Sequence, residues 1–294
     1  MLDPYILGEE GTWIPPCPVA HRDDDYDSHG FESLRAMQTG HFWYRGRHRF
    51  IMHFTRGIVR HFQGRGQKPS AVDLGGGCGG WISYLAERAG NEFSELALAD
   101  SSPIALAFAR DLVPEGTRRY HVDLLNLQWS DRWDIAFLLD VLEHLEEDEV
   151  ALRQIGRALR PGGYLVVATP AFERFRTSID DMTHHVRRYQ RRDFERLARV
   201  TGLALIECRY FMFFLSPLMW LARRKSPNPA TMTRLQIRQH LERSAGTPVG
   251  PLNSALAAIF AAETPLGAWL PFPWGTSLLA VLQRPDANSS LVLE

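Results

Sequence analysis

The sequence predicts an α/β protein built on one mostly parallel sheet, and three observations support this prediction. Short β-branched or apolar runs alternate with runs of helical spacing between residues 71 and 170. The first strand-like run ends in "VDLGGGCGG", where five glycines fall among six positions. The chain of 294 residues is 45% hydrophobic and 23% charged, so it can bury a sizeable core. Strands that alternate with helices in this way form βαβ units with both faces of the sheet covered.

The segment before the first strand divides into two parts. Residues 1–30 are rich in Pro, Gly, Asp and His without a sustained period, so they predict an irregular arm. Apolar and aromatic residues then recur at helical spacing in "FESLRAMQTGHFWYRGRHRFIMHFTRGIVRHF". We therefore expect residues 1–62 to form an arm followed by one or two helices.

The core is expected over residues 63–211, with the last strand and a tail over 276–294. The segment between them, 212–275, is too long for a simple connection and should carry helices of its own. The motif "RPGG" ends one helix and turns the chain into the next strand. The expected strands are 71–74, 95–100, 118–124, 133–140, 163–170, 203–211 and 276–284, and the expected core helices are 80–90, 102–113, 146–160 and 191–202.

Composition narrows the classes of partner. A formal net charge of −1 argues against a nucleic-acid binder that relies on a large positive charge, so a small-molecule partner is expected. Cys17, Cys78 and Cys208 lack ligand-like spacing, and no metal site is predicted. The N-terminus lacks the pattern of a signal peptide, and the apolar run 210–222 is too short to span a bilayer. We expect a cytoplasmic protein; the sequence leaves its oligomeric state open.

The glycine-rich loop is typical of a nucleotide-like ligand site at the end of a strand. Gly75, Gly77 and Gly80 spell GxGxxG, while Asp73 begins a DxGxGxG pattern that ends at Gly79. The glycines alone do not separate NAD from another adenosine-bearing cofactor. An acid at Asp73 would be unfavourable beside a pyrophosphate and favourable beside an ammonium group, which favours a methionine-type cofactor.

Two further acids end strands at the same edge of the predicted sheet. Asp100, which closes "ELALAD", is placed to accept hydrogen bonds from ribose hydroxyls in either cofactor class. Asp123 follows the third strand. Because the glycine loop holds no Lys or Arg, these acids favour a cationic ligand.

The successive motifs "VDLGGGCGG", "LALAD", "HVDLL", "WDIAFLLDVLEHLEE" and "ALRPGGYLVVATP" resemble those of class I S-adenosylmethionine-dependent methyltransferases. The resemblance is close over residues 70–170 and looser over 185–284. It implies a Rossmann-like sheet of seven strands whose last strand is antiparallel, with S-adenosyl-L-methionine lying across the carboxyl ends of the strands.

The resemblance also implies roles for individual residues in cofactor binding. The methionine moiety would lie at Asp73 and the glycine loop, the ribose at Asp100, and the adenine at Asp123 and Leu124. Trp43 and the two residues Tyr44 and Arg47 would belong to a helical lid, with Arg47 directed toward the cofactor carboxylate. The implied cofactor residues are Tyr44, Arg47, Asp73, Gly75, Gly76, Gly77, Gly79, Asp100, Ser101, Asp123, Leu124 and Asp140.

The acceptor side is less defined by sequence. Proteins of similar sequence carry an H-x-R-R-Y motif where this chain has "HVRRY", which places His185, Arg188 and Tyr189 over the acceptor. His144 follows a strand and is the second candidate for a general base. A solvated basic loop and a structural histidine are the alternatives for these residues. We expect residues 212–275 to form a helical cap that lines the acceptor pocket.

These observations favour methyl transfer to a small molecule, by O- or N-methylation of a sugar, a lipid-linked compound or a natural-product intermediate. Two alternatives remain open at this point. The embedded GxGxxG is compatible with an NAD-dependent oxidoreductase. The aromatic run "RYFMFFLSPLMWLARRK", which ends in three basic residues, is compatible with a non-catalytic, membrane-associated module or with a lipid-linked substrate.

Overall fold

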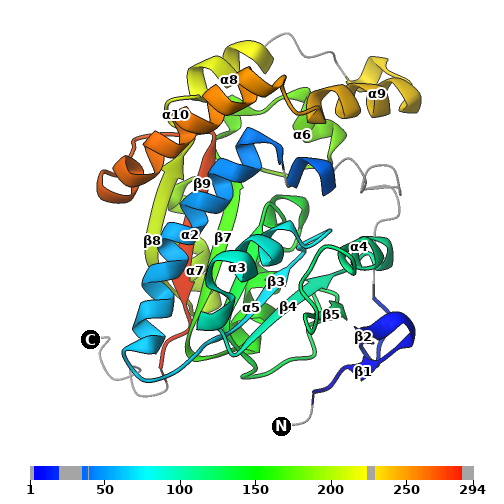
Figure 1. The fold of residues 1–294 in the computed structure, drawn as a ribbon, viewed down its shortest axis with the longest axis vertical. Coiled ribbons are helices and arrows are strands. Elements are labelled where there is room, and N and C mark those ends of the chain that lie inside the picture. Colours follow the sequence, from blue (N-terminus) through cyan, green and yellow to red (C-terminus); the bar gives the residue numbers. More distant parts are fainter. Residues whose placement is uncertain (1–2, 20–34, 39, 224–228, 287–294) are drawn as a thin grey trace.

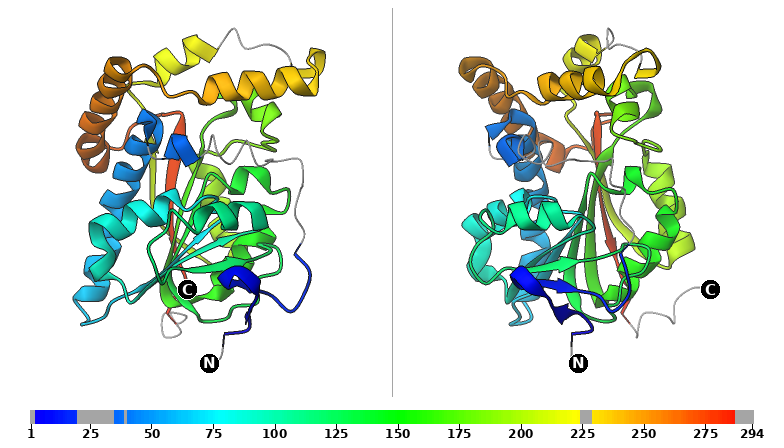
Figure 2. Two further views of the ribbon diagram at one scale, coloured as in Figure 1. Left: turned by 45° about the vertical axis from the view of Figure 1, so that its right-hand side comes forward. Right: turned by 90° about the vertical axis from the view of Figure 1, so that its right-hand side faces the viewer.

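A computed structural model describes residues 3–19, 35–38, 40–223 and 229–286. One nine-stranded sheet lies between two layers of helices (Figures 1 and 2). Across the sheet the strands follow the order β1-β2-β5-β4-β3-β6-β7-β9-β8. Their bounds are β1 (Ile6–Leu7), β2 (Thr12–Ile14), β3 (Ser70–Leu74), β4 (Glu95–Asp100), β5 (Arg118–His121), β6 (Trp133–Leu139), β7 (Leu159–Pro170), β8 (Ala204–Phe211) and β9 (Ser277–Gln283).

The central strands pair in parallel, as the sequence predicts. β3 lies between β4 and β6, and Leu74 is in register with Ala99 on one side and Leu138 on the other. β9 pairs antiparallel with both β7 and β8. The predicted mostly parallel α/β sheet with an antiparallel last strand is therefore confirmed.

The strand number differs from the predicted seven because the N-terminal arm extends the sheet. β2 pairs in parallel with β5, and β1 pairs antiparallel with β2. Tyr5 is buried beside these strands and packs on Tyr120 and Trp129, with ring centroids 5.3 and 4.7 Å away. The prediction of an irregular arm is wrong for residues 6–14. Strands this short show no period, and long-range aromatic packing fixes them.

Two helical layers cover the two faces of the sheet. Figure 2 shows α2 (Phe42–Gln63), α3 (Gly80–Ala89) and α4 (Pro103–Ala109) on one side, and α5 (Asp148–Ala158) and α7 (Arg191–Thr201) on the other. Along β6, Ile135 and Phe137 belong to the apolar cluster under α2 and α3, whereas Ala136 and Leu138 belong to the cluster under α5 and α7. A strand buried on both faces in this way reads as a continuous apolar run.

The remaining helices gather beyond the carboxyl ends of the parallel strands (Figure 1). Residues 212–275 hold the expected helices. No helix among the described residues is long and apolar enough to cross a membrane. These helices are α6 (Ser178–Met182), α8 (Ser216–Arg223), α9 (Arg234–Ala245) and α10 (Gly250–Trp269), and short 3-10 turns occur at η1 (Glu9–Gly11), η2 (Gly90–Glu92), η3 (Leu142–His144), η4 (Glu173–Phe175) and η5 (Pro229–Thr231).

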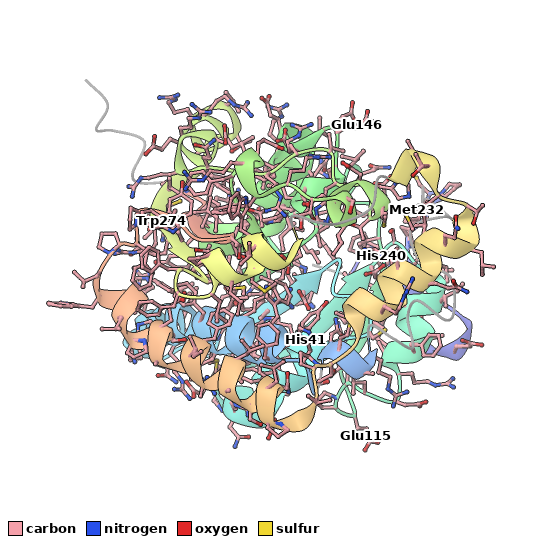
Figure 3. The ribbon with its side chains drawn as sticks, turned by 90° about the horizontal axis from the view of Figure 1, so that it is seen from above. His41, Glu115, Glu146, Met232, His240 and Trp274 are labelled. Carbon is pink, nitrogen blue, oxygen red and sulfur yellow. The ribbon has the colours of Figure 1, made fainter. Side chains whose placement is uncertain are left out.

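Helix α10 braces the start of α2. The Asn253 side chain accepts a hydrogen bond from Phe42 N at 2.8 Å and donates one to Gly40 O at 3.0 Å. A Cβ atom at Gly46 would lie 1.9 Å from Cδ1 of Phe260, so the two helices meet where α2 has no side chain. Seen from above, His41 at the beginning of α2 lies near α10 (Figure 3). The helical insertion thus fixes the segment that precedes the core.

We expect Gly46→Ala to lower the free energy of unfolding by about 1–3 kcal/mol, because the added methyl group overpacks the contact with Phe260. Gly57→Ala on the same helix is the matched control. A Cβ at Gly57 meets nothing within 4 Å, so this change should stabilise the protein by about 0.5–1 kcal/mol. Urea denaturation of both variants measures the difference. Equal effects of the two substitutions would contradict the proposed close contact.

Candidate active site

One cavity of about 570 Å³ opens at the carboxyl ends of the parallel strands, where ligands bind in sheets of this type. Its volume suits a small ligand with a cofactor. Its walls come from the first turns of α2, the loop after β3, the ends of β4 and β6, η3, the segment 179–188, and α8 through Met219. Segments far apart in the sequence therefore meet around one space.

The glycine loop after β3 approaches its neighbours too closely for side chains. Gly75 has φ +70°, and a Cβ atom there would lie 2.5 Å from Cγ2 of Val141. Gly77, at φ 57°, donates its backbone N–H to Oδ2 of Asp100 at 2.8 Å. Gly75, Gly76 and Gly77 line the cavity. The loop thus presents main chain to the cavity.

Asp73, at the end of β3, is a buried carboxylic acid that faces this cavity. Burial raises its pKa to about 8, and the neighbouring Asp100 acts in the same direction while Arg47 opposes it. Its Oδ1 atom is buried and makes no hydrogen bond within the described structure. A carboxyl group in this state fits an ammonium group of a ligand, which would satisfy Oδ1 and favour the ionised form.

The other predicted cofactor residues lie around the same space. Asp100 accepts hydrogen bonds from Gly77 N and from Ser102 N, the latter at 2.8 Å, so its carboxylate is held in place. Asp123 accepts a hydrogen bond from Leu125 N at 2.9 Å. The cavity-lining set also includes Ser101 and Leu124.

The predicted lid residues and Asp140 form one electrostatic group. Arg47 is buried, and its Nη1 forms an ion pair with Oδ2 of Asp140. The guanidinium lies 5.0 Å from the ring centroid of Trp43 and 4.8 Å from that of Tyr44. Asp140 has φ 59°, a left-handed conformation that is uncommon outside glycine and that turns the chain sharply after β6. α2 is thereby tied to the edge of the cavity.

Two predicted site residues lie outside the set that lines the cavity. Gly79, at φ +82°, precedes α3, and a Cβ there would lie 2.4 Å from Cγ1 of Val113, so its requirement for glycine comes from packing. Tyr189 is buried in the core, and its hydroxyl lies 3.0 Å from Oδ2 of Asp148 and 3.2 Å from Leu142 O. Tyr189 therefore supports the turn η3 and does not contact the cavity.

The segment with the "HVRRY" motif forms a buried network. Arg188 donates from Nε to Oδ1 of Asp180 at 2.8 Å and from Nη2 to Oδ2 at 3.0 Å. Nδ1 of His185 lies 2.9 Å from the same Oδ1. Although burial raises the pKa of Asp180, the hydrogen bonds from His185 and Arg188 lower it well below its usual range. The predicted His185 and Arg188 both line the cavity, and Asp180 orients them.

The fold brings a second loop against this network. Val186 N donates to Glu143 O at 2.8 Å, and the rings of His144 and His185 meet edge to face with centroids 4.7 Å apart. Glu143 is fully buried, and neither of its carboxylate oxygens has a hydrogen-bond partner in the described structure. Burial and the nearby Asp140 raise the pKa of Glu143 well above its usual range.

Sequence reasoning missed some residues that line the cavity and the roles of others. Glu143 and His144 are expected at the site, because the family resemblance implies that "LEH" at 142–144 lines it opposite the glycine loop. The sequence did not indicate a chemical role for Glu143, since its burial depends on the packing of η3. The sequence did not indicate a role for Asp180, because its partners His185 and Arg188 lie further along the chain, outside its own helix. Gln38 also lines the cavity. Met212 and Met219 line it from the segment 212–275, which is expected to form a wall of the acceptor pocket.

The fold and the site define a Rossmann-like protein with a cavity lined by carboxylates and a glycine loop at the carboxyl ends of its parallel strands. A sequence profile described as "Methyltransferase domain" matches residues 42–208 of this chain. The match covers more than half of the sequence, and the chain belongs to this methyltransferase family. It is a methyltransferase.

Solved structures share the fold. Phosphoethanolamine N-methyltransferase 2 of Haemonchus contortus, in complex with S-adenosyl-L-methionine, has a TM-score of 0.55 and 18% identity, covering 93% of this chain and 62% of that one. The same enzyme with phosphomonomethylethanolamine and S-adenosylhomocysteine gives a TM-score of 0.54 at 18% identity, over 93% and 62% of the two chains. A candidate methyltransferase of Bacillus halodurans gives 0.50 at 15% identity, over 74% and 94%. These identities establish the fold alone.

The pKa of Asp73 makes ligand binding depend on pH. The folded protein retains a proton on Asp73 up to about pH 8, whereas the unfolded chain releases it near about pH 4. Unfolding free energy of the ligand-free protein should therefore fall as pH rises through this window. An ammonium group favours the ionised form, so affinity for S-adenosylhomocysteine should rise by up to about tenfold per pH unit between pH 6 and 7.

Calorimetry of S-adenosylhomocysteine binding in two buffers with different ionisation enthalpies measures this proton release. The wild type should release up to one proton for each ligand bound. Asp73→Asn is the matched variant, and it should bind more weakly without proton release. Equal proton release by both proteins would contradict a role for Asp73 opposite the ammonium group.

Proposed function

We propose that this enzyme transfers the methyl group of S-adenosyl-L-methionine to an oxygen or nitrogen atom of a small-molecule acceptor, a sugar, a lipid-linked compound or a natural-product intermediate. One observation carries the proposal. A single cavity is lined at one place by the predicted cofactor residues Asp73, Asp100 and Asp123, and at another by His144 and His185. A donor and an acceptor can thus lie in contact within one space.

We assign the cofactor residues the roles that the family resemblance implies. Asp73 would receive the ammonium group, Asp100 the ribose hydroxyls, and Asp123 the adenine amino group with Leu124 beside the ring. Gly75, Gly76 and Gly77 leave room for close approach of the main chain. S-adenosyl-L-methionine supplies an activated methyl group when bound.

The protein contributes mainly alignment of the acceptor and exclusion of water. Proximity of this kind is worth up to about 7–11 kcal/mol. We propose that the first turns of α2 act as a lid in which Tyr44 and Arg47 cover the cofactor. His185 and His144 remain the candidates for a general base, which adds about 10²- to 10⁴-fold. The contact between His185 and Asp180 supports the first of these, because it orients the imidazole toward a fixed tautomer.

Residues 212–275 would contribute an apolar wall of the acceptor pocket. Met212 and Met219 from this segment line the cavity, which supports a bulky or partly hydrophobic acceptor. The alternative of an NAD-dependent oxidoreductase, based only on GxGxxG, loses its support because the chain belongs to a methyltransferase family.

Asp100→Asn should weaken S-adenosylhomocysteine binding by about 1.5–3 kcal/mol, because a charged hydrogen-bond acceptor for the ribose is lost. Calorimetry measures the affinity, and Asp111→Asn, at an exposed position, serves as the control. The wild type should also form S-adenosylhomocysteine when it is incubated with labelled donor and a metabolite extract. Wild-type affinity in Asp100→Asn would rule out this ribose assignment.

An exposed apolar face supports the lipid-linked class of acceptor. Glu263 is the one ionisable residue of α10, and it is fully buried, with Oε2 accepting from Phe214 N at 3.0 Å. The solvent-facing side of α10 is therefore uncharged, and Leu266 and Trp269 are exposed on it. Trp220 on α8 and Trp274 are also exposed, the latter at the margin of this end in Figure 3. Tryptophans at the edge of an apolar face suit a lipid interface.

The same segment connects this face with the cavity, because α8 carries both Trp220 and the cavity-lining Met219. A lipid surface against α8 and α10 would deliver an apolar acceptor beside the site. The basic residues Arg224 and Lys225, which prompted the membrane hypothesis, lie outside the described residues.

We expect the wild type to co-sediment with phosphatidylcholine vesicles. The double variant Leu266→Ser/Trp269→Ser should bind at least about tenfold more weakly, since burial of one large apolar side chain contributes about 1.5–3 kcal/mol. Val200→Ser removes an exposed apolar side chain from α7 and is the control. A wild type that stays in the supernatant would exclude a lipid surface as the partner, while leaving cofactor binding unaffected.

A further inference from the structure

The cluster at the acceptor end of the cavity has the composition of a transition-metal site. Glu143, His144 and His185 each offer a ligand atom, and these atoms all lie within 4.8 Å of one another. All three residues line the cavity. Ligand atoms around a tetrahedral zinc ion lie about 3.4 Å apart, so small side-chain rotations would close the set.

Glu143 independently indicates a missing cationic partner. Its carboxyl group is fully buried, and both oxygens lack a hydrogen bond in the described structure. The nearest guanidinium groups have other partners, since Arg188 binds Asp180 and Arg47 pairs with Asp140. A buried carboxyl group without a partner is costly, and coordination of a metal ion is one of the few ways to offset that cost.

His185 has the surroundings of a metal-binding histidine. Its Nδ1 lies 2.9 Å from Oδ1 of Asp180, whose carboxylate is fixed in turn by two nitrogens of Arg188. Because the carboxylate of Asp180 faces Nδ1, Nε2 is the imidazole nitrogen that remains for a metal ion. A carboxylate–histidine contact of this kind orients ligating histidines and raises their basicity.

We propose that Glu143, His144 and His185 bind one divalent transition-metal ion, such as Zn²⁺. Two imidazoles and one carboxylate favour such an ion over Mg²⁺ or Ca²⁺, which prefer oxygen ligands. Three protein ligands leave a coordination position open toward the cavity. The role of the ion rests on the proposed methyl transfer. The ion would bind and orient the acceptor's oxygen. It would also lower the pKa of a bound hydroxyl group, so that this group gives its proton to water at a lower pH than in the free acceptor.

The metal ion and a histidine general base exclude one another, because both require the same imidazole nitrogen. Zn²⁺ binding therefore separates the two assignments. The sequence indicates His144 and His185 singly as candidates for a general base and does not predict a metal site. The contact between Val186 N and Glu143 O brings the distant loop of His185 to Glu143 and His144.

Calorimetric titration of the chelator-treated full-length protein with ZnCl₂ tests the proposal. The wild type should bind one equivalent, and Glu143→Gln and His185→Gln should each lower the affinity at least about tenfold. His53→Gln, which changes an exposed histidine on α2, should bind as the wild type does. Wild-type protein without saturable Zn²⁺ binding would overturn the metal site and leave the general base.

S-adenosylhomocysteine binding by the same samples reports the integrity of the fold. If Glu143→Gln fails to bind this ligand, His185→Gln at the partly exposed position decides the question. Equal Zn²⁺ affinity in His185→Gln and the wild type would also refute the proposal. Zn²⁺ binding without S-adenosylhomocysteine binding in the wild type would instead contradict the proposed function and retain the metal site.

Discussion

The parallel pairing of β3 with β4 and β6 is the constraint on which the site depends. Because Leu74 is in register with Ala99 and Leu138, the residues that follow these three strands meet at one edge of the sheet. Asp73, Asp100 and Asp140 gather there, and the sharp turns of the glycine loop and of Asp140 leave space between them. A slip of one residue would turn the side chains of a strand to the opposite face.

Several carboxyl groups therefore lie close together in a poorly solvated space. Some of them are stabilised by ion pairs and others by a bound proton. Asp140 pairs with Arg47, and Asp180 pairs with Arg188 and His185. Asp73 and Glu143 have no such partner among the described residues, and burial raises the pKa of both. In the ligand-free protein, burial therefore favours the protonated, neutral form of both carboxyl groups. Both groups face the cavity, where a cationic ligand would replace that proton.

The helical insertion has a broader part in the structure than a wall of the acceptor pocket. Through Asn253 and Phe260, α10 fixes the first turns of α2, which carry Tyr44 and Arg47. The segment that we propose as a lid is therefore held in place by the insertion. The outer face of α10 is free of charge because its one acid, Glu263, is buried against the end of β8. One helix thus connects the lid, the sheet and an apolar surface.

The sequence by itself determined the alternation of strands and helices, the glycine loop and the acids that end β3 and β4. These features are local, since hydrophobic period, glycine and strand ends lie within a few residues of one another. Only the tertiary structure decided the others. β1 and β2 depend on the packing of Tyr5 against Tyr120 and Trp129, which no local period reveals. Tyr189 lies outside the predicted site, because it is buried in the core and its hydroxyl group contacts η3 from that side. Glu143 is buried next to His185, and this contact between two loops that are distant in sequence cannot be predicted from a local pattern.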